Sequence, residues 1–141
     1  MRENNLIMKT KAKYTPKKLT TIVYILLICF GGFLAIAKWG RVFNENFYIL
    51  PDEINAHVSN FAISLIFYLG IGYSWLLYGV KFRAIAVLGL VLIVANFICE
   101  TLMSFMNTID IFDAIAGSIG VLLGFIFLLL ANKYGLRKDE N

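Results

Sequence analysis

The side chains in this sequence that can do chemistry are few, and they recur at helical spacing. His57 is the only histidine, and Glu53 precedes it by four residues. Asn96 and Glu100 are also four residues apart, and residues at this spacing share one face of a helix. A histidine near carboxylates can act in acid–base catalysis or bind a polar ligand. The candidate ligand-binding residues are His57, Glu100, Asp113, Glu53, Asn96 and Asn107.

Other kinds of site lack support in the sequence. The sequence contains no CxxC pair, no dense set of metal ligands and no nucleophile-elbow motif. We therefore assign no catalytic residue and expect neither a metal ion nor a cofactor.

The composition defines what kind of molecule holds these residues. Hydrophobic residues make up 60% of the 141 residues, and charged residues make up 16%. A soluble domain carries about 25% charged residues, and one membrane crossing needs about 20 apolar residues. The chain is therefore predicted to be a small integral membrane protein. This excludes a secreted globular enzyme, a nucleic-acid-binding domain and a disordered tail protein.

Four apolar runs interrupt the polar sequence, and each is long enough to cross a bilayer as a helix. A transmembrane β-barrel would need strict alternation of polar and apolar residues instead. We expect an all-α integral membrane protein, a four-helix transmembrane bundle. The predicted spans lie at about 19–37, 58–78, 84–103 and 112–131 of a transmembrane domain 19–131, between a basic segment 1–18 and a polar tail 132–141.

The cations are distributed asymmetrically. Eleven of the 13 Lys and Arg residues lie in the two terminal segments and the turn at 79–83. Because cytoplasmic loops are enriched in Lys and Arg, both termini are predicted to be cytoplasmic, with 38–56 and 104–111 outside. Aromatic residues of the first outer loop predict a possible short interfacial helix. The first run, which ends in Ala35-Ile36-Ala37, also resembles a signal peptide, and we favour an uncleaved helix.

The polar residues of the last three spans all fall towards the predicted outer surface. Ionisable groups at the bilayer centre cost about 2.5–3.5 kcal/mol each. Glu100 lies inside a span, so it must be protonated, paired with His57 or facing a water-filled pocket. We expect His57, Glu100 and Asp113 to converge, although His57 can also simply be solvated. Asp110 is interpreted as a first-turn acid that stabilises its helix.

Glycines predict where the helices pack closely. Gly117, Gly120 and Gly124 recur on one face of the fourth span, and glycine permits close backbone approach inside a membrane. We favour packing within one chain over a homodimer seam. Gly70, Gly72 and Ser74 are expected to act in the same way on the second span.

The order of these polar residues resembles that of the VanZ-like family of bacterial membrane proteins. That family has an acid and a histidine at the start of one helix, as in Glu53-Ile54-Asn55-Ala56-His57. Glu100 matches the glutamate of the next helix, and Asp113 matches an aspartate that opens another. The chain departs from the family pattern at Ile54, Met103, Asn107 and Gly117, where Lys, Gln, Arg and Asn are usual.

The resemblance implies a location in the bacterial plasma membrane and a role at the cell envelope. The founding member of the family is linked to resistance against the glycopeptide antibiotic teicoplanin. The leading prediction is therefore an outer-leaflet site, lined by His57, Glu100 and Asp113, that binds an amphiphile. The expected partners are membrane lipids and a lipid-linked envelope precursor or lipoglycopeptide, without nucleic acid, and the oligomeric state is open.

Two other functions fit the same residues. One is a membrane enzyme that acts on a lipid headgroup with a His/Glu/Asp site. The other is a small ion or proton transporter that works as an oligomer, although a relay needs ionisable groups through the whole membrane.

Overall fold

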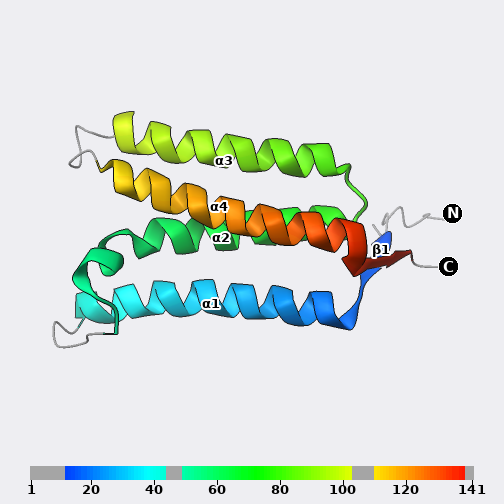
Figure 1. Ribbon diagram of the computed structural model, residues 1–141, viewed down its shortest axis with the longest axis horizontal. Coiled ribbons are helices and arrows are strands. Elements are labelled where there is room, and N and C mark those ends of the chain that lie inside the picture. The colour runs from blue at the N-terminus through cyan, green and yellow to red at the C-terminus, as the bar shows by residue number, and fades with distance from the viewer. Residues whose placement is uncertain (1–11, 44–48, 103–109, 139–141) are drawn as a thin grey trace, which may run out of the picture.

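Four helices form an up-and-down bundle in this computed structural model, which describes residues 12–43, 49–102 and 110–138 (Figure 1). Each helix is long and apolar enough to cross a membrane. The expectation of an all-helical protein with four possible membrane spans is confirmed. The helices are α1 (Lys18–Phe43), α2 (Asp52–Leu77), α3 (Phe82–Leu102) and α4 (Ile111–Leu130).

Two helices are longer than the apolar runs that predict them. α1 continues to Phe43 instead of ending near residue 37, and α2 begins at Asp52 instead of near residue 58. An apolar run corresponds only to the part of a helix that crosses the hydrocarbon core, whereas the helix itself can continue through the polar interface. Trp39 therefore belongs to α1 and not to a separate interfacial helix. Residues 44–48 of that predicted helix lie outside the described residues, so it stays a prediction.

The helices are arranged with α2 and α4 at the centre. α1 packs against α2, and α3 packs mainly against α4 (Figure 1). In α2 and in α4, 44% of the most apolar stretch of the helix is buried inside the protein. In α1 and in α3, the buried share of that stretch is only 11%. The two outer helices therefore direct most of their apolar side chains away from the protein, towards lipid.

Small residues bring α2 and α4 together. A Cβ atom added at Gly120 would meet the backbone carbonyl oxygen of Phe61, and one at Gly124 would lie 2.9 Å from the Tyr68 ring. Close packing of this kind replaces the hydrophobic effect as the force between helices in lipid. The predicted packing face of the fourth span is confirmed within one chain. On α2, Gly72 packs against Leu128, but Gly70 faces open space, so its predicted packing role is wrong.

The half of the bundle nearer the termini has an apolar core. Its fully buried residues come from α2, α3 and α4. The Tyr68 hydroxyl lies among them and donates a hydrogen bond to the Ile85 carbonyl oxygen at 2.9 Å. Its polar atom is therefore satisfied inside the apolar core. The largest fully buried side chains are Tyr68, Leu65, Leu69, Ile85, Leu128 and Val121.

The two terminal segments pair with each other, which sequence analysis did not predict. Strand β1 (Tyr14–Pro16) runs antiparallel to β2 (Leu136–Lys138), which follows a π-helical turn, η2 (Ala131–Gly135). Both termini therefore leave the bundle at the same end, as an even number of spans requires (Figure 1). We call this the terminal end and the opposite one the loop end. The cytoplasmic placement of the termini stays a prediction.

Candidate functional site

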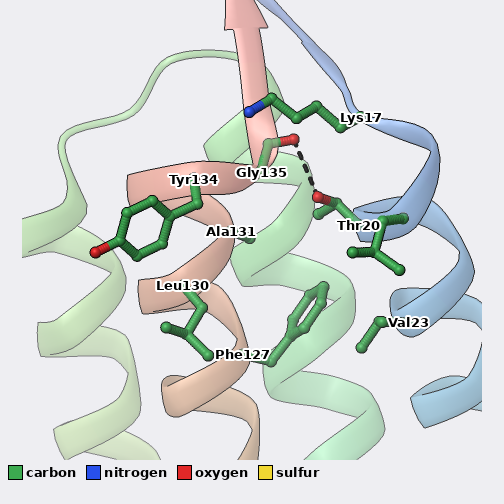
Figure 2. Close-up of a pocket in the computed structure, with 9 residues that line it drawn as sticks. Lys17, Thr20, Val23, Phe127, Leu130, Ala131, Tyr134 and Gly135 are labelled. Carbon is green, nitrogen blue, oxygen red and sulfur yellow. Dashed lines mark hydrogen bonds between the residues drawn. The ribbon is translucent and has the colours of Figure 1, made fainter.

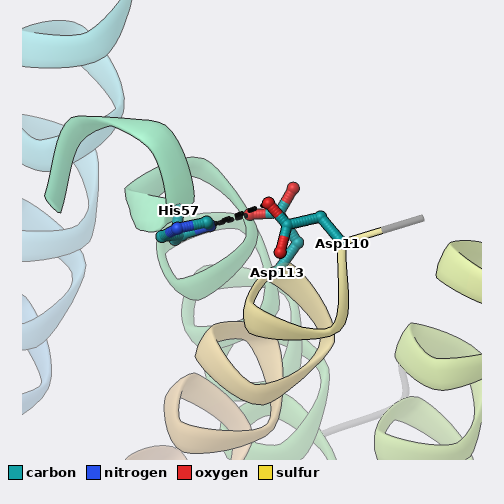
Figure 3. Close-up of side chains that lie close together, drawn as sticks. All are labelled: His57, Asp110 and Asp113. Carbon is teal, nitrogen blue, oxygen red and sulfur yellow. Dashed lines mark hydrogen bonds and ion pairs between the residues drawn. The ribbon is translucent and has the colours of Figure 1, made fainter. Parts of the chain in front are cut away.

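His57 and Asp113 meet at the loop end of the bundle (Figure 3). His57 lies in the second turn of α2, and Asp113 lies in the first turn of α4. The His57 Nδ1 atom is 2.7 Å from the Asp113 Oδ1 atom, a short hydrogen bond. Their side chains are 29% and 21% exposed, so the pair is accessible from the loop end and is not fully solvated. The structure thus brings together two of the three residues predicted to converge.

Asp110 joins this pair while it also caps a helix. As the N-cap residue of α4, it accepts a hydrogen bond from the Phe112 amide on Oδ1 at 3.0 Å, which agrees with its interpretation as a helix-stabilising acid. Its other oxygen, Oδ2, lies 3.6 Å from the His57 Nδ1 atom. No pattern in the sequence predicted this second contact. We call His57, Asp110 and Asp113 the His57 cluster.

Glu100 is hydrogen-bonded to a residue outside the candidate set, Asn60. The Asn60 amide group donates a hydrogen bond to the Glu100 Oε1 atom at 3.4 Å, a long contact between α2 and α3. Asn60 lies almost one helical turn beyond His57, and its side chain faces α3 where that of His57 faces α4. The spacing along α2 therefore directs the two neighbouring polar residues to different helices.

Ser64 and Asn96 form a third contact deeper in the bundle. The Asn96 amide group donates to the Ser64 hydroxyl oxygen at 3.2 Å, and the Ser64 hydroxyl is 3.3 Å from the Asn96 carbonyl oxygen. Asn96 also packs on α4, because a Cβ atom at Gly117 would lie 2.6 Å from its nitrogen. We call the three contacts His57–Asp113, Asn60–Glu100 and Ser64–Asn96 the polar ladder. Its α2 residues are spaced by three and four, a helical-face signal that the candidate set did not use.

Lys38 connects the first helix to this end of the molecule. Its ammonium group donates to the Ala56 carbonyl oxygen at 2.8 Å and to the Ser59 hydroxyl at 2.9 Å. Lys38 extends from α1 along α2 and so places a positive charge beside the polar ladder. The sequence placed Lys38 in the predicted outer loop 38–56, and no sequence pattern predicted its contacts with α2.

Of the two remaining candidates, Glu53 does not join the ladder. Glu53 is exposed in the first turn of α2. Asn107 lies outside the described residues. The described part of the candidate site is thus the polar ladder, Asp110 and Lys38.

Cavities lie at the other end of the molecule. One of about 330 Å³ opens between α1 and η2 and is mostly apolar, with Lys17 and Tyr134 among its lining residues (Figure 2). A second, of about 440 Å³, lies between Trp75 and the start of α3. Neither of these two cavities is lined by a residue of the polar ladder. The predicted outer-leaflet site lined by His57, Glu100 and Asp113 therefore stays a prediction.

Comparisons with known proteins do not identify a family. The chain matches no protein-family model, no curated protein and no solved structure. The resemblance to VanZ-like proteins therefore rests on the short sequence motifs alone. Of those motifs, the structure places Glu53 and His57 in α2, Glu100 in α3 and Asp113 in α4.

Proposed function

We propose that this multi-pass membrane protein is a VanZ-like cell-envelope protein that binds the polar head of an amphiphile at the loop end. The observation that carries the proposal is the polar ladder, in which three helices direct polar side chains to one another from the loop end into the bundle. Ionisable groups inside a span are costly, and a functional role is the default hypothesis for them. The apolar core of the other half has no comparable row among the described residues.

The charges at the loop end suggest what kind of head group fits. Among the described residues of the loop end, carboxylates outnumber the two cations, Lys38 and Arg41, and the Lys38 ammonium is already hydrogen-bonded. The carboxylates are Asp52, Glu53, Glu100, Asp110 and Asp113. Carboxylates accept hydrogen bonds from hydroxyl and amino groups. A sugar or amino-sugar head group supplies both, and a lipid-linked envelope precursor and a lipoglycopeptide each carry such a head.

The apolar part of an amphiphile would lie on the outside of the bundle. Beside the His57 cluster, α4 exposes Ile111 at 58% and Phe112 at 68%. These side chains face away from the core at the same level as the carboxylates. An acyl or polyprenyl chain can therefore run along α4 while its head reaches His57. The cation distribution predicts that this end faces away from the cytoplasm, and the resemblance to VanZ-like proteins implies that the membrane is the bacterial plasma membrane.

Binding in nanodiscs tests the proposal. The probes are a fluorescent lipoglycopeptide and a fluorescent polyprenyl-linked disaccharide, titrated onto wild type, Asp113→Asn and Glu100→Gln. Loss of a charged hydrogen-bond partner should weaken binding of one probe by about tenfold. Glu53→Gln removes an exposed acid at the same end and should change nothing. Equal affinity of the wild type and both ladder variants would overturn the proposal.

A second function is favoured by one distance. The His57 Nδ1 atom is bonded to Asp113, which holds the ring so that Nε2 faces away from the carboxylate. An aspartate that orients a histidine in this way is part of general-base catalysis in many hydrolases. A lipid-headgroup enzyme would turn over a labelled lipid precursor and lose that turnover in His57→Gln. Absence of turnover in the wild type would exclude this alternative for that substrate.

A further inference from the structure

We propose that the His57 cluster binds a divalent transition-metal ion of the zinc class at the loop end. One atom from each of His57, Asp110 and Asp113 can serve as a ligand, and these atoms lie within 4.8 Å of one another. Figure 3 shows both carboxylates directed at the same edge of the imidazole ring. The inference is independent of amphiphile binding, because it uses only the geometry of these three side chains.

The distances fit a metal site after small side-chain rotations. In a tetrahedral zinc site the metal–ligand distances of about 2.0–2.1 Å place neighbouring ligand atoms about 3.3 Å apart. The His57 Nδ1 atom lies 2.7 Å from one carboxylate and 3.6 Å from the other, so the observed values bracket the required one. A metal ion that replaces the shared proton needs the closer pair to open by about 0.6 Å.

The donor set also selects the class of metal. One imidazole and two carboxylates suit zinc and its neighbours, whereas magnesium and calcium prefer oxygen ligands alone. The two aspartates supply two negative charges against the two positive charges of the ion. Three protein ligands leave a fourth position for water or a ligand group, as in catalytic zinc sites. The exposed fractions of the three side chains, 21–39%, leave the ion a path from the loop end.

The hydrogen bond between His57 and Asp113 does not explain why Asp110 also faces the His57 Nδ1 atom. The Nδ1 atom of a histidine carries one proton, and that proton is committed to Asp113 at 2.7 Å. A second carboxylate on the same nitrogen adds repulsion between the acids. The N-terminus of α4 stabilises both acids, but it does not require both to face one nitrogen. The Phe112 amide holds Asp110 in this orientation through Oδ1, as outer hydrogen bonds hold metal ligands.

Metal titration of the purified full chain tests the inference. The untagged protein in nanodiscs is stripped with a chelator and titrated with Zn²⁺, and separately with Co²⁺, whose tetrahedral complexes absorb strongly in the visible. Wild type should bind one equivalent with a dissociation constant below about 100 μM and keep it in millimolar Mg²⁺. His57→Gln and Asp113→Asn should each weaken binding by tenfold or more.

Matched variants distinguish metal binding at the His57 cluster from metal binding elsewhere in the chain. Asp110→Asn retains the helix cap, because asparagine is also a good N-cap residue, and should still lose about tenfold in affinity. Glu53→Gln should bind like the wild type, and circular dichroism should show equal helicity for all variants. The exposed thiols are removed by Cys29→Ser with Cys99→Ser, which should leave Co²⁺ absorption unchanged.

Three results would overturn the inference. One is no saturable Zn²⁺ or Co²⁺ binding by the wild type. Another is binding that the three cluster variants leave unchanged while they keep wild-type helicity. The third is binding that disappears when the two cysteines are replaced.

Discussion

At the loop end, side chains from three helices bond to one another, whereas at the terminal end the strands β1 and β2 bond through their backbones. The loop end has the polar ladder, with hydrogen-bond distances between 2.7 and 3.4 Å. The terminal end has β1 and β2, together with the Gly135 carbonyl oxygen, which accepts from the Lys17 amide at 2.8 Å and from the Thr20 hydroxyl at 3.1 Å. Its core is apolar and closely packed.

This difference separates two tasks within one bundle. Backbone pairing and apolar packing use groups that every sequence has, and they stabilise a shape without chemical selectivity. Ionisable side chains are expensive in a membrane and offer specific recognition. The loop end therefore has the residues of a binding site, whereas the terminal end has contacts that stabilise the fold. The cations of the terminal end, such as Lys133 and Arg137, are exposed and can contact lipid headgroups.

The largest expected effect concerns which way the two ends face. In a background with Cys29→Ser and Cys99→Ser, intact cells are treated with a membrane-impermeant thiol reagent. Glu53→Cys at the loop end should be labelled, and Arg137→Cys at the terminal end should be labelled only after permeabilisation, because cytoplasmic segments carry most of the cations. The reverse pattern would place the polar ladder inside the cell and contradict the envelope function.

The next effect tests the packing of α2 against α4 in the middle of the bundle. Gly120→Ala places a methyl group against the Phe61 backbone, which cannot rotate away as a side chain can. We expect a loss of about 3 kcal/mol in the free energy of unfolding, measured by denaturation in mixed micelles. Gly70→Ala is the matched control, since a Cβ atom there meets nothing within 4 Å. Equal stability of the two variants would mean that α2 and α4 do not pack through Gly120.

A smaller effect measures one contact of the polar ladder. A double-mutant cycle with Ser64→Ala and Asn96→Ala isolates the coupling energy between α2 and α3. We expect about 1 kcal/mol, within the range for hydrogen bonds between membrane helices. Additive effects of the two substitutions would show that Ser64 and Asn96 do not interact, and the ladder would then lose its deepest contact.

The smallest effect belongs to the terminal end. Thr20→Val removes the hydroxyl that donates to Gly135 but keeps the shape of the buried side chain. The Gly135 carbonyl oxygen still accepts from the Lys17 amide, so no buried acceptor loses all its partners. The free energy of unfolding should fall by only about 0.5 kcal/mol, and head-group binding at the loop end should not change. If Thr20→Val lowered the free energy of unfolding by more than the Ser64–Asn96 coupling energy, the side-chain contact at the terminal end would be the stronger of the two.

Much of the fold was accessible from the sequence, because hydrophobicity acts locally along the chain. Four apolar runs predicted four helices, and the recurring glycines of the last run predicted its packing face. The proximity of His57 and Asp113 also followed, since both stand near the start of helices that begin at the same end. The contact between Glu100 and Asn60 was not predicted, because a helix turns by about 100° per residue, so small changes in rotation decide which neighbour a side chain meets.

The sequence by itself thus determined the class of the molecule, the number of helices and the end at which polar residues gather, because each of these depends on which residue types occur and in what order. Only the tertiary structure decided which side chains bond. It directed Asn60 to Glu100, added Asp110 to His57, brought Lys38 across from the first helix and joined the two termini in a small sheet. The physical reason is that contacts between helices depend on their rotation and depth relative to one another. Packing of the whole bundle sets these quantities, and no local pattern in the chain records them.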